Sequence, residues 1–258
     1  MADRQPIMAG NWKMHMDHLE AIQLVQQLVY HLDSGDLETN EVVVIPPFTA
    51  LRSIQTLIEG DRLEIGLGAQ NCHHEDAGAF TGEVSPPMLA RLKVRYVVCG
   101  HSERRQIFSE DDATVNRKVR AVLGHGMVPI LCVGETDEQR ESGDAQKVVA
   151  DQLRGSLAEV SEQHMADMVI AYEPVWAIGT GKTASAEDAD EMCGFVREQV
   201  GELAGSSAAD TVRIQYGGSV KPGNVAELMG REQIDGALVG GASLDAEDFA
   251  VIARWHRL

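Results

Sequence analysis

Short apolar runs alternate with longer amphipathic stretches along the whole chain. Eight of these runs are short and rich in apolar and β-branched residues, which is typical of strands buried on both faces. They are Ile7 to Gly10, Val42 to Ile45, Leu63 to Gly68, Arg95 to Cys99, Val128 to Val133, Met168 to Tyr172, Thr211 to Tyr216 and Gly236 to Val239. Between these runs, apolar residues at helical spacing predict helices. Two of the predicted helices begin at capping boxes, Asp17 with Glu20 and Ser185 with Asp188.

Eight strand–helix units in 258 residues predict an α/β fold, a (β/α)8 barrel in which residues 1–258 form a single domain. An open doubly wound sheet is the alternative. A barrel should carry its chemistry just after the carboxyl ends of its strands. Polar and glycine residues do follow the predicted strands, at Asn11 to Lys13, Gly100 to Arg105, Glu173, Gly217 to Ser219 and Gly240 to Ser243.

The segment after Glu173 is unusually long for a strand–helix connection. It runs from Pro174 to Ala184, whereas such connections usually have about 2 to 6 residues. Pro174 ends the strand, and Gly179 and Gly181 give the other end of the loop conformational freedom. The pattern predicts a carboxylate base beneath a moving lid.

Two nucleotide-binding motifs are only partly matched in this loop. Gly179 to Thr183 resembles the end of a phosphate loop, but Trp176 stands where that motif needs its first glycine. The dinucleotide fingerprint must follow its strand immediately, and Pro174 to Ile178 intervene here. We therefore do not expect nucleotide binding at this loop.

The formal net charge of −18 argues against nucleic acid as a partner. The chain shows no membrane-spanning run and no secretory signal, so we expect a soluble, cytoplasmic protein with no membrane partner. The four cysteines are widely spaced, which predicts buried reduced thiols and neither a disulfide framework nor a zinc site. An anionic substrate would need local donors to outweigh the overall charge.

The glycine pairs after the last two strands predict a phosphate cradle. Gly217-Gly218 with Ser219, and Gly240-Gly241, allow backbone N–H groups to approach an anion closely. Lys13 is the candidate local cation, and Asn11 beside it offers a neutral amide. A surface lysine is the plainer interpretation of Lys13, but its position at a strand end favours a role toward a ligand.

His101 and Glu173 are the candidate acid–base groups. No second spaced histidine supports a metal at His101, and the helix start at Ser102-Glu103 should disfavour its charged form and leave a neutral donor. Water exclusion by the lid should raise the pKa of Glu173 toward the range of a general base. A base, a neutral donor, a cation and a phosphate cradle suit proton abstraction beside a carbonyl.

At these residues the sequence resembles the triosephosphate isomerase family, whose fold is the TIM barrel. The matching motifs are Gly10 to Met14, Ala69 to Asn71, Gly78 to Glu83, Gly100 to Arg105, Cys132 to Glu135, Ala171 to Lys182, Tyr216 to Val220 and Val239 to Leu244. They span the chain in order, and their combined specificity is high.

The resemblance implies a glycolytic and gluconeogenic enzyme that interconverts dihydroxyacetone phosphate and D-glyceraldehyde 3-phosphate without a cofactor or metal. By the same resemblance Glu173 is the base, His101 the electrophile, and Lys13 and Asn11 stabilise charge. Substrate phosphate would be held by Gly179, Ser219, Gly240 and Gly241, and Glu103 would support Lys13.

The resemblance also implies a homodimer, in which residues 70–83 form the dimer loop and Thr81 reaches toward the neighbouring subunit's site. Cys72-His73-His74-Glu75 within that loop could suggest a metal site. Four adjacent ligands rarely share one tetrahedral geometry, so a polar interface or surface loop is the better interpretation.

Two other functions are compatible with parts of the pattern. A barrel aldolase would use a Schiff-base lysine, for which Lys13 is the candidate. A non-catalytic phosphate-binding module or dimeric scaffold would need only the cradle. The combination of base, electrophile and lid favours the isomerase over both.

Overall fold

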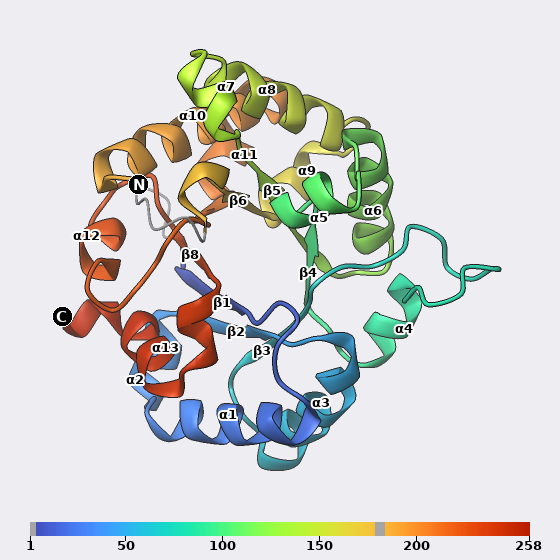
Figure 1. Ribbon diagram of the computed structural model, residues 1–258, viewed down its shortest axis with the longest axis vertical. Coiled ribbons are helices and arrows are strands. Elements are labelled where there is room, and N and C mark those ends of the chain that lie inside the picture. Colours follow the sequence, from blue (N-terminus) through green and yellow to red (C-terminus); the bar gives the residue numbers. More distant parts are fainter. Residues whose placement is uncertain (1–3, 179–183) are drawn as a thin grey trace.

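The computed structural model describes residues 4–178 and 184–258, and its eight parallel strands close into a barrel (Figure 1). The strands are β1 Ile7–Asn11, β2 Glu41–Ile45, β3 Gly66–Ala69, β4 Tyr96–Cys99, β5 Val128–Val133, β6 Val169–Tyr172, β7 Arg213–Tyr216 and β8 Gly236–Val239. Each strand pairs with the next one along the chain, and β8 pairs with β1 through Met8 and Ala237. The predicted barrel is confirmed, and the open-sheet alternative is wrong.

Helices surround the barrel in chain order (Figure 1). They are α1 His18–Tyr30, α2 Ser34–Thr39, α3 Phe48–Asp61, α4 Pro86–Arg91, α5 Ser102–Ile107, α6 Asp112–Gly124, α7 Asp137–Glu141, α8 Ala145–Ser156, α9 Glu162–Asp167, α10 Ala186–Ala204, α11 Ser206–Thr211, α12 Val225–Met229 and α13 Ala246–Ala253, with short 3-10 helices η1 Val175–Ala177, η2 Gly241–Leu244 and η3 Trp255–Arg257. Both predicted capping boxes are present, at Asp17 with Glu20 before α1 and at Ser185 with Asp188 before α10.

Two predicted strands begin two or three residues later than their apolar patterns suggested, whereas β4 and β6 begin one residue later. β3 begins at Gly66, because Arg62 takes a left-handed backbone with φ 55° and the Leu63 N–H donates to the Ile58 carbonyl to end α3. β7 begins at Arg213, because residues up to Thr211 belong to α11. In both places apolar residues that look like a strand start serve to end a helix.

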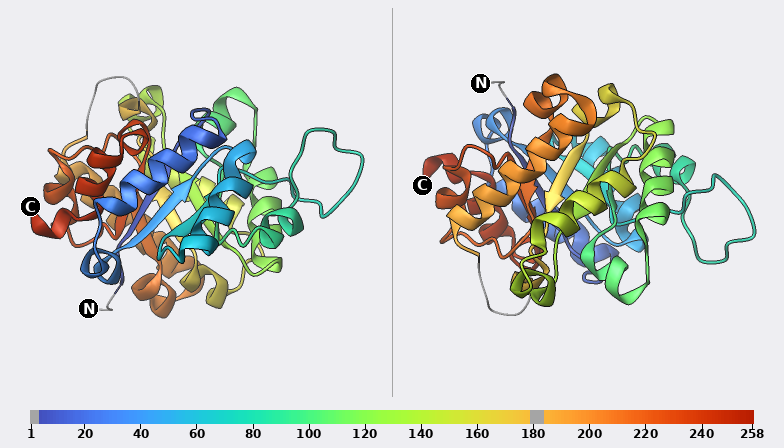
Figure 2. Two further views of the ribbon diagram at one scale, coloured as in Figure 1. Left: turned by 90° about the horizontal axis from the view of Figure 1, so that it is seen from below. Right: turned by 90° about the horizontal axis from the view of Figure 1, so that it is seen from above.

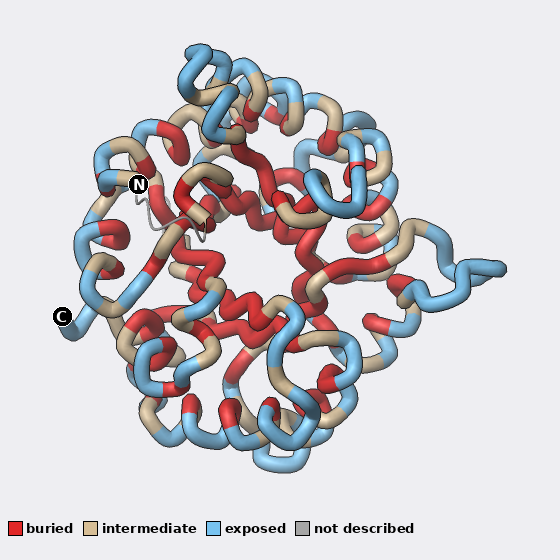
Figure 3. The backbone as a smooth tube through the Cα atoms, viewed as in Figure 1, coloured by how far each residue is buried: buried red, intermediate tan, exposed pale blue. Residues whose placement is uncertain are grey.

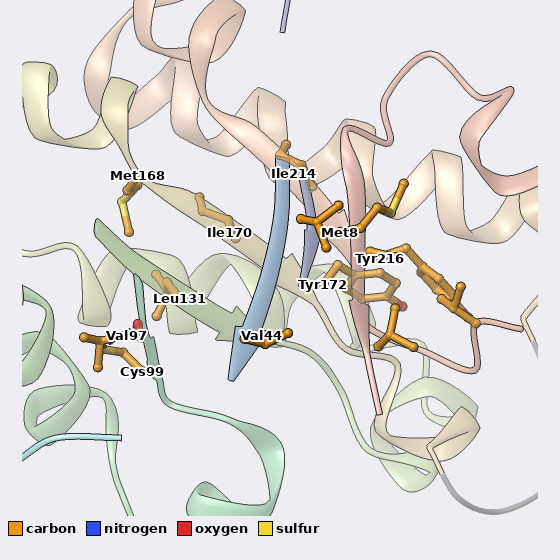
Figure 4. Close-up of a cluster of buried hydrophobic side chains, with 14 of the residues drawn as sticks. Met8, Val44, Val97, Cys99, Leu131, Met168, Ile170, Tyr172, Ile214 and Tyr216 are labelled. Atoms are coloured by element: carbon orange, nitrogen blue, oxygen red, sulfur yellow. Dashed lines mark hydrogen bonds between the residues drawn. The ribbon is translucent and has the colours of Figure 1, made fainter. Parts of the chain in front are cut away.

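The strands are buried on both faces, as predicted. Figure 3 shows buried residues along the strands and exposed residues on the outer sides of the helices. Within β1, Ile7 and Ala9 belong to a cluster inside the barrel, whereas Met8 packs in a larger cluster between strands and helices. Figure 4 shows part of this second cluster, with Met8, Leu131 and Ile170. These two clusters of buried apolar side chains hold in place the strand ends that carry the site.

The connection between β3 and α4 extends away from the barrel as an exposed loop (Figure 2). All four cysteines are buried and free, in agreement with the sequence analysis. Within the described ranges, no helix is long and apolar enough to cross a membrane. The described residues also contain no group of three His, Cys, Asp or Glu side chains that could hold a metal ion.

Candidate active site

The carboxyl ends of five strands surround a cavity of ≈ 470 Å³. The predicted site residues that line it are Asn11, Lys13, His101, Glu173, Ser219, Gly240 and Gly241. Ile178 and Leu238 add apolar surface to the same cavity. Residues that the sequence placed only at the ends of separate strands therefore face one space.

Glu173 follows β6 directly and is 2% exposed. Its N–H donates to the Val133 carbonyl over 2.8 Å, which extends the β5–β6 ladder by one residue. Gly217, after β7, leaves room for the side chain, since a Cβ there would lie 2.9 Å from the Glu173 Cγ atom. The barrel thus places the candidate base, with its carboxylate facing β4.

Both carboxylate oxygens of Glu173 have N–H partners. Oε1 lies 3.0 Å from His101 Nε2, and Oε2 accepts the Ser102 N–H over 2.8 Å. Burial alone would raise the pKa of Glu173, but the paired His101 ring and the Ser102 N–H together lower it below its ordinary value. The expected rise in the pKa of Glu173 is therefore wrong for this conformation, in which the carboxylate is held ionised.

His101 stands at the start of α5, where its ring is also held at both nitrogens. Nδ1 accepts the Glu103 N–H over 3.2 Å, so the neutral ring carries its proton on Nε2, facing Glu173. Burial opposes a charged ring, but the Glu173 carboxylate outweighs it and raises the pKa of His101, so the expectation that the charged ring is disfavoured is wrong for this conformation. Protonation of Nδ1 would break the bond from Glu103. If Glu173 moves away, burial and that bond both favour the neutral donor.

Lys13 takes a left-handed backbone with φ 52° just after β1. Its N–H donates to Asn11 Oδ1 over 3.1 Å, and its Nζ atom lies 2.6 Å from Glu103 Oε1. The ammonium also lies 3.9 Å from where a Cβ on Gly240 would stand. Because Lys13 is held as an ion pair, the geometry does not favour the Schiff-base alternative, which needs a neutral amine.

Gln70 supports Lys13, although the sequence motifs had placed it only at the start of the predicted dimer loop. Its Nε2 donates to the Lys13 carbonyl over 2.6 Å and to the Ile45 carbonyl over 3.1 Å. Gln70 directly follows β3, so the strand-end rule could have identified it. Its amide links the loop after β1 to the end of β2.

The predicted phosphate cradle lines the same cavity after β7 and β8, with Gly240 close to the Lys13 side chain. Ser219, Gly240 and Gly241 line it, and η2 begins at Gly241. Asn224, a residue without a role in the sequence analysis, holds this loop by donating to the Ser219 carbonyl over 2.9 Å. Gly179, the fourth predicted phosphate ligand, lies outside the described residues.

Glu135 lies just after β5 and binds residues on both sides of Glu173. Its carboxylate is fully buried, accepts the Tyr172 hydroxyl over 3.0 Å and the Trp176 indole N–H over 2.9 Å, and pairs with Arg140. Tyr172 precedes the base and Trp176 follows it in η1. The described start of the predicted lid is therefore tied to the end of β5.

Thr81 and Glu103 complete the predicted set. Glu103 pairs with Lys13, in the position of the expected supporting residue. Thr81 is exposed on the loop after β3 and, among the described residues, does not belong to those lining the cavity of its own chain. The structure thus gathers the other described site residues and leaves Thr81 apart.

Comparisons with known proteins agree over nearly the full length. The family model of triosephosphate isomerase matches residues 6–256. Triosephosphate isomerases of Streptomyces avermitilis and Streptomyces coelicolor are 56% and 54% identical over 256 residues, which cover 99% of this chain and of each relative. A crystal structure of triosephosphate isomerase from Bartonella henselae superposes with a TM-score of 0.87 at 36% identity, covering 98% of this chain and 100% of that one. The chain therefore belongs to the triosephosphate isomerase family.

Proposed function

We propose that Glu173 and His101 carry out the isomerisation of dihydroxyacetone phosphate and D-glyceraldehyde 3-phosphate in the described cavity. The observation that carries this proposal is the 3.0 Å contact between Glu173 Oε1 and His101 Nε2 at the edge of a space lined by a cation and glycine loops. A carboxylate and an imidazole that share one N–H can each turn to a substrate between them.

The reaction begins when Glu173 takes a proton from the carbon beside the substrate carbonyl. Before this step the carboxylate must exchange its His101 partner for the substrate, which frees the Nε2–H to donate to the carbonyl oxygen. Loss of the carboxylate partner lowers the pKa of the ring, so the ring acts as a neutral donor to the enediolate. Return of the proton to the neighbouring carbon, together with transfer of the hydroxyl proton to the former carbonyl oxygen, completes the isomerisation.

Lys13 and Asn11 stabilise the negative charge that develops on the substrate oxygens. Glu103 keeps the ammonium in place through the 2.6 Å ion pair. Ser219, Gly240 and Gly241, together with Gly179, hold the phosphate through N–H groups and a hydroxyl. These local donors overcome the net charge of −18, since surface charge is screened within about 8 Å.

The same reasoning extends to the setting of the reaction. Proton transfer between adjacent carbons is an internal redox change that balances without an external electron carrier, so no cofactor is needed. We place the enzyme in glycolysis and gluconeogenesis in the cytoplasm, with residues 1–258 acting as one domain.

A homodimer is the proposed assembly, supported by the loop after β3. Residues 75–83 of this loop are exposed and extend from the barrel (Figure 2), and Phe80 is 45% exposed. Exposed aromatic residues are enriched at protein–protein interfaces. Sedimentation equilibrium should give twice the chain mass of 28.0 kDa, and Phe80→Asp should shift the protein toward monomer. A monomeric parent protein would contradict the dimer.

Hydrogen exchange tests the proposed chemistry directly. Incubation with dihydroxyacetone phosphate in deuterated water should place deuterium on the carbon of the substrate and product, because the transferred proton mixes with solvent. Glu173→Gln should lose both exchange and turnover. Retention of either at the parent rate would show that Glu173 is not the base.

A further inference from the structure

The main chain around Glu173 rests on the end of β5. The Glu173 N–H donates to the Val133 carbonyl, and the Val175 N–H donates to the Glu135 carbonyl over 3.1 Å. Gly134 lies between these two acceptors, and a Cβ there would stand only 1.8 Å from the Glu173 carbonyl oxygen. The position of the base therefore depends on where the backbone of Gly134 is held.

A side chain from α8 holds Gly134 at both of its polar backbone groups. Gln152 Oε1 accepts the Gly134 N–H over 2.7 Å, and Gln152 Nε2 donates to the Gly134 carbonyl over 3.1 Å. A planar amide that accepts from and donates to one residue fixes the orientation of that residue as well as its position. Gln152 is carried by a packed helix, since its neighbours Val149 and Leu153 are fully buried.

The packing beside this contact leaves space for movement. A cavity of ≈ 110 Å³ is lined by Gln152, Gly134 and Glu173, among other residues. Close packing would keep the end of β5 in place without specific bonds, but a cavity allows it to shift when those bonds are lost. Gln152 thus supplies restraint that the local packing does not.

We propose that Gln152 is a positioning residue for the isomerisation, acting through Gly134 on the backbone of Glu173. The inference rests on the proposed role of Glu173 as the base. Gln152 is not among the described residues that line the ≈ 470 Å³ cavity, so it should affect the proton-transfer step and leave substrate binding largely intact. Misplacement of a reacting group by about 1 Å can cost on the order of a hundredfold in rate.

Gln152→Met removes both hydrogen bonds at nearly constant side-chain length. The matched control is Gln146→Met, the same change at an exposed position of the same helix. We expect kcat of Gln152→Met to fall roughly ten- to a hundredfold with KM within about twofold of the parent value. The primary kinetic isotope effect with substrate deuterated at the transferred position should rise, because proton transfer becomes more rate-limiting. Gln146→Met should match the parent in all three measurements.

A purely structural role for Gln152 gives a different result. It would lower the thermal unfolding midpoint and the yield of folded enzyme, but kcat per folded molecule and the isotope effect would stay at the parent values, and this outcome overturns the inference. Folded enzyme is quantified by circular dichroism, and Gln152→Ala serves if the Met variant does not fold. Glu173→Gln is measured in parallel. If Glu173→Gln keeps its activity, the proposed function fails. If Glu173→Gln loses activity and Gln152→Met does not, only the proposed role of Gln152 fails.

Discussion

A buried or partly buried glutamate lies at each end of this barrel, and the two are held in different ways. Glu41 begins β2 at the amino end, where it pairs with Arg213 over 2.7 Å and Arg95 over 2.6 Å. Glu173 follows β6 at the carboxyl end, where it is bound by the His101 ring and a backbone N–H. Only the second lies at the edge of the cavity that we assign to the substrate.

The amino end is a closed ion network. The Tyr96 hydroxyl donates to Glu41 over 2.6 Å and accepts from Arg213 over 2.9 Å. Burial, partly offset by the Arg213 charge, raises the pKa of Tyr96 to about 12. A cavity of ≈ 380 Å³ adjoins this network, but its Glu41 and Glu59 carboxylates are already paired with Arg95 and Lys93. A cavity with charged residues is therefore not by itself a reactive site.

The partner of each carboxylate accounts for the difference. Arginine stays charged at every working pH and cannot exchange a proton, so the pairs that Arg213 and Arg95 form with Glu41 offer no proton transfer. Histidine changes charge near neutrality and can redirect its N–H to another acceptor. The same residue type therefore stabilises the barrel at one end and can serve as a base at the other.

Glu173→Gln should produce the largest effect of these variants. It should lower the activity at the carboxyl end of the barrel and leave the stability nearly unchanged. We expect kcat to fall roughly 10²- to 10⁴-fold, the usual contribution of general acid–base catalysis. The free energy of unfolding at pH 8 should stay within about 1 kcal/mol of the parent value, because the amide oxygen can still accept the Ser102 N–H. Steady-state kinetics and urea denaturation give the two numbers. A large loss of stability with little loss of kcat would remove the contrast between the ends.

Glu41→Gln applies the same change to the other end and should have the opposite profile. Leaving Arg213 without its carboxylate should lower the free energy of unfolding by about 3 kcal/mol, as expected when one partner of a buried ion pair is removed. The kcat of the folded enzyme should not change. Glu159→Gln is the control, because the exposed pair of Glu159 with Arg120 should contribute less than about 1 kcal/mol. Equal stability loss in the two variants would contradict the proposed importance of the amino-end network.

A smaller effect is expected in the pH dependence of stability, which should differ between the parent protein and Glu173→Gln. The pKa of Glu173 is lowered from 4.5, so its contribution is present above pH 4.5 and is lost as the pH falls through the folded value. The pKa of His101 is raised from 6.5, so its contribution is full below pH 6.5 and is lost as the pH rises through the folded value. The parent should therefore exceed Glu173→Gln in stability most between pH 4.5 and 6.5.

Proton NMR titration of the His101 ring provides an independent check. The ring should titrate at higher pH in the parent protein than in Glu173→Gln, because the variant lacks the neighbouring carboxylate. An unchanged midpoint would show that the two side chains do not interact in solution.

Much of the fold could be predicted from local patterns. Apolar runs located all eight strands, and the capping boxes at Asp17 and Ser185 located two helix starts. The largest errors were at Leu63 and Thr211, where the residues that end a helix resemble the start of a strand. Helix termination there depends on backbone conformation and on hydrogen bonds that residue type alone does not specify.

The sequence predicted which side chains share the cavity better than it predicted their charge. Strand-end positions identified Lys13, His101 and Glu173, because parallel strands in a barrel all end at one face. The strand-end pattern gave no role to Glu135 or Gln152. Glu135 accepts the Trp176 indole N–H, and Gln152 accepts the Gly134 N–H. It also gave the wrong direction for the pKa of Glu173, since burial was foreseeable and the compensating N–H donors were not.

Local patterns in the chain specify which residues form strands, which begin helices and which polar groups stand at the strand ends. These features depend on interactions over a few residues, so the apolar periodicity and the helix-capping residues indicate them. The three-dimensional packing brings Glu173 to His101, binds Gln152 to Gly134 and pairs the first strand with the last. Those contacts depend on the register and closure of the whole barrel, which no local stretch of the chain specifies.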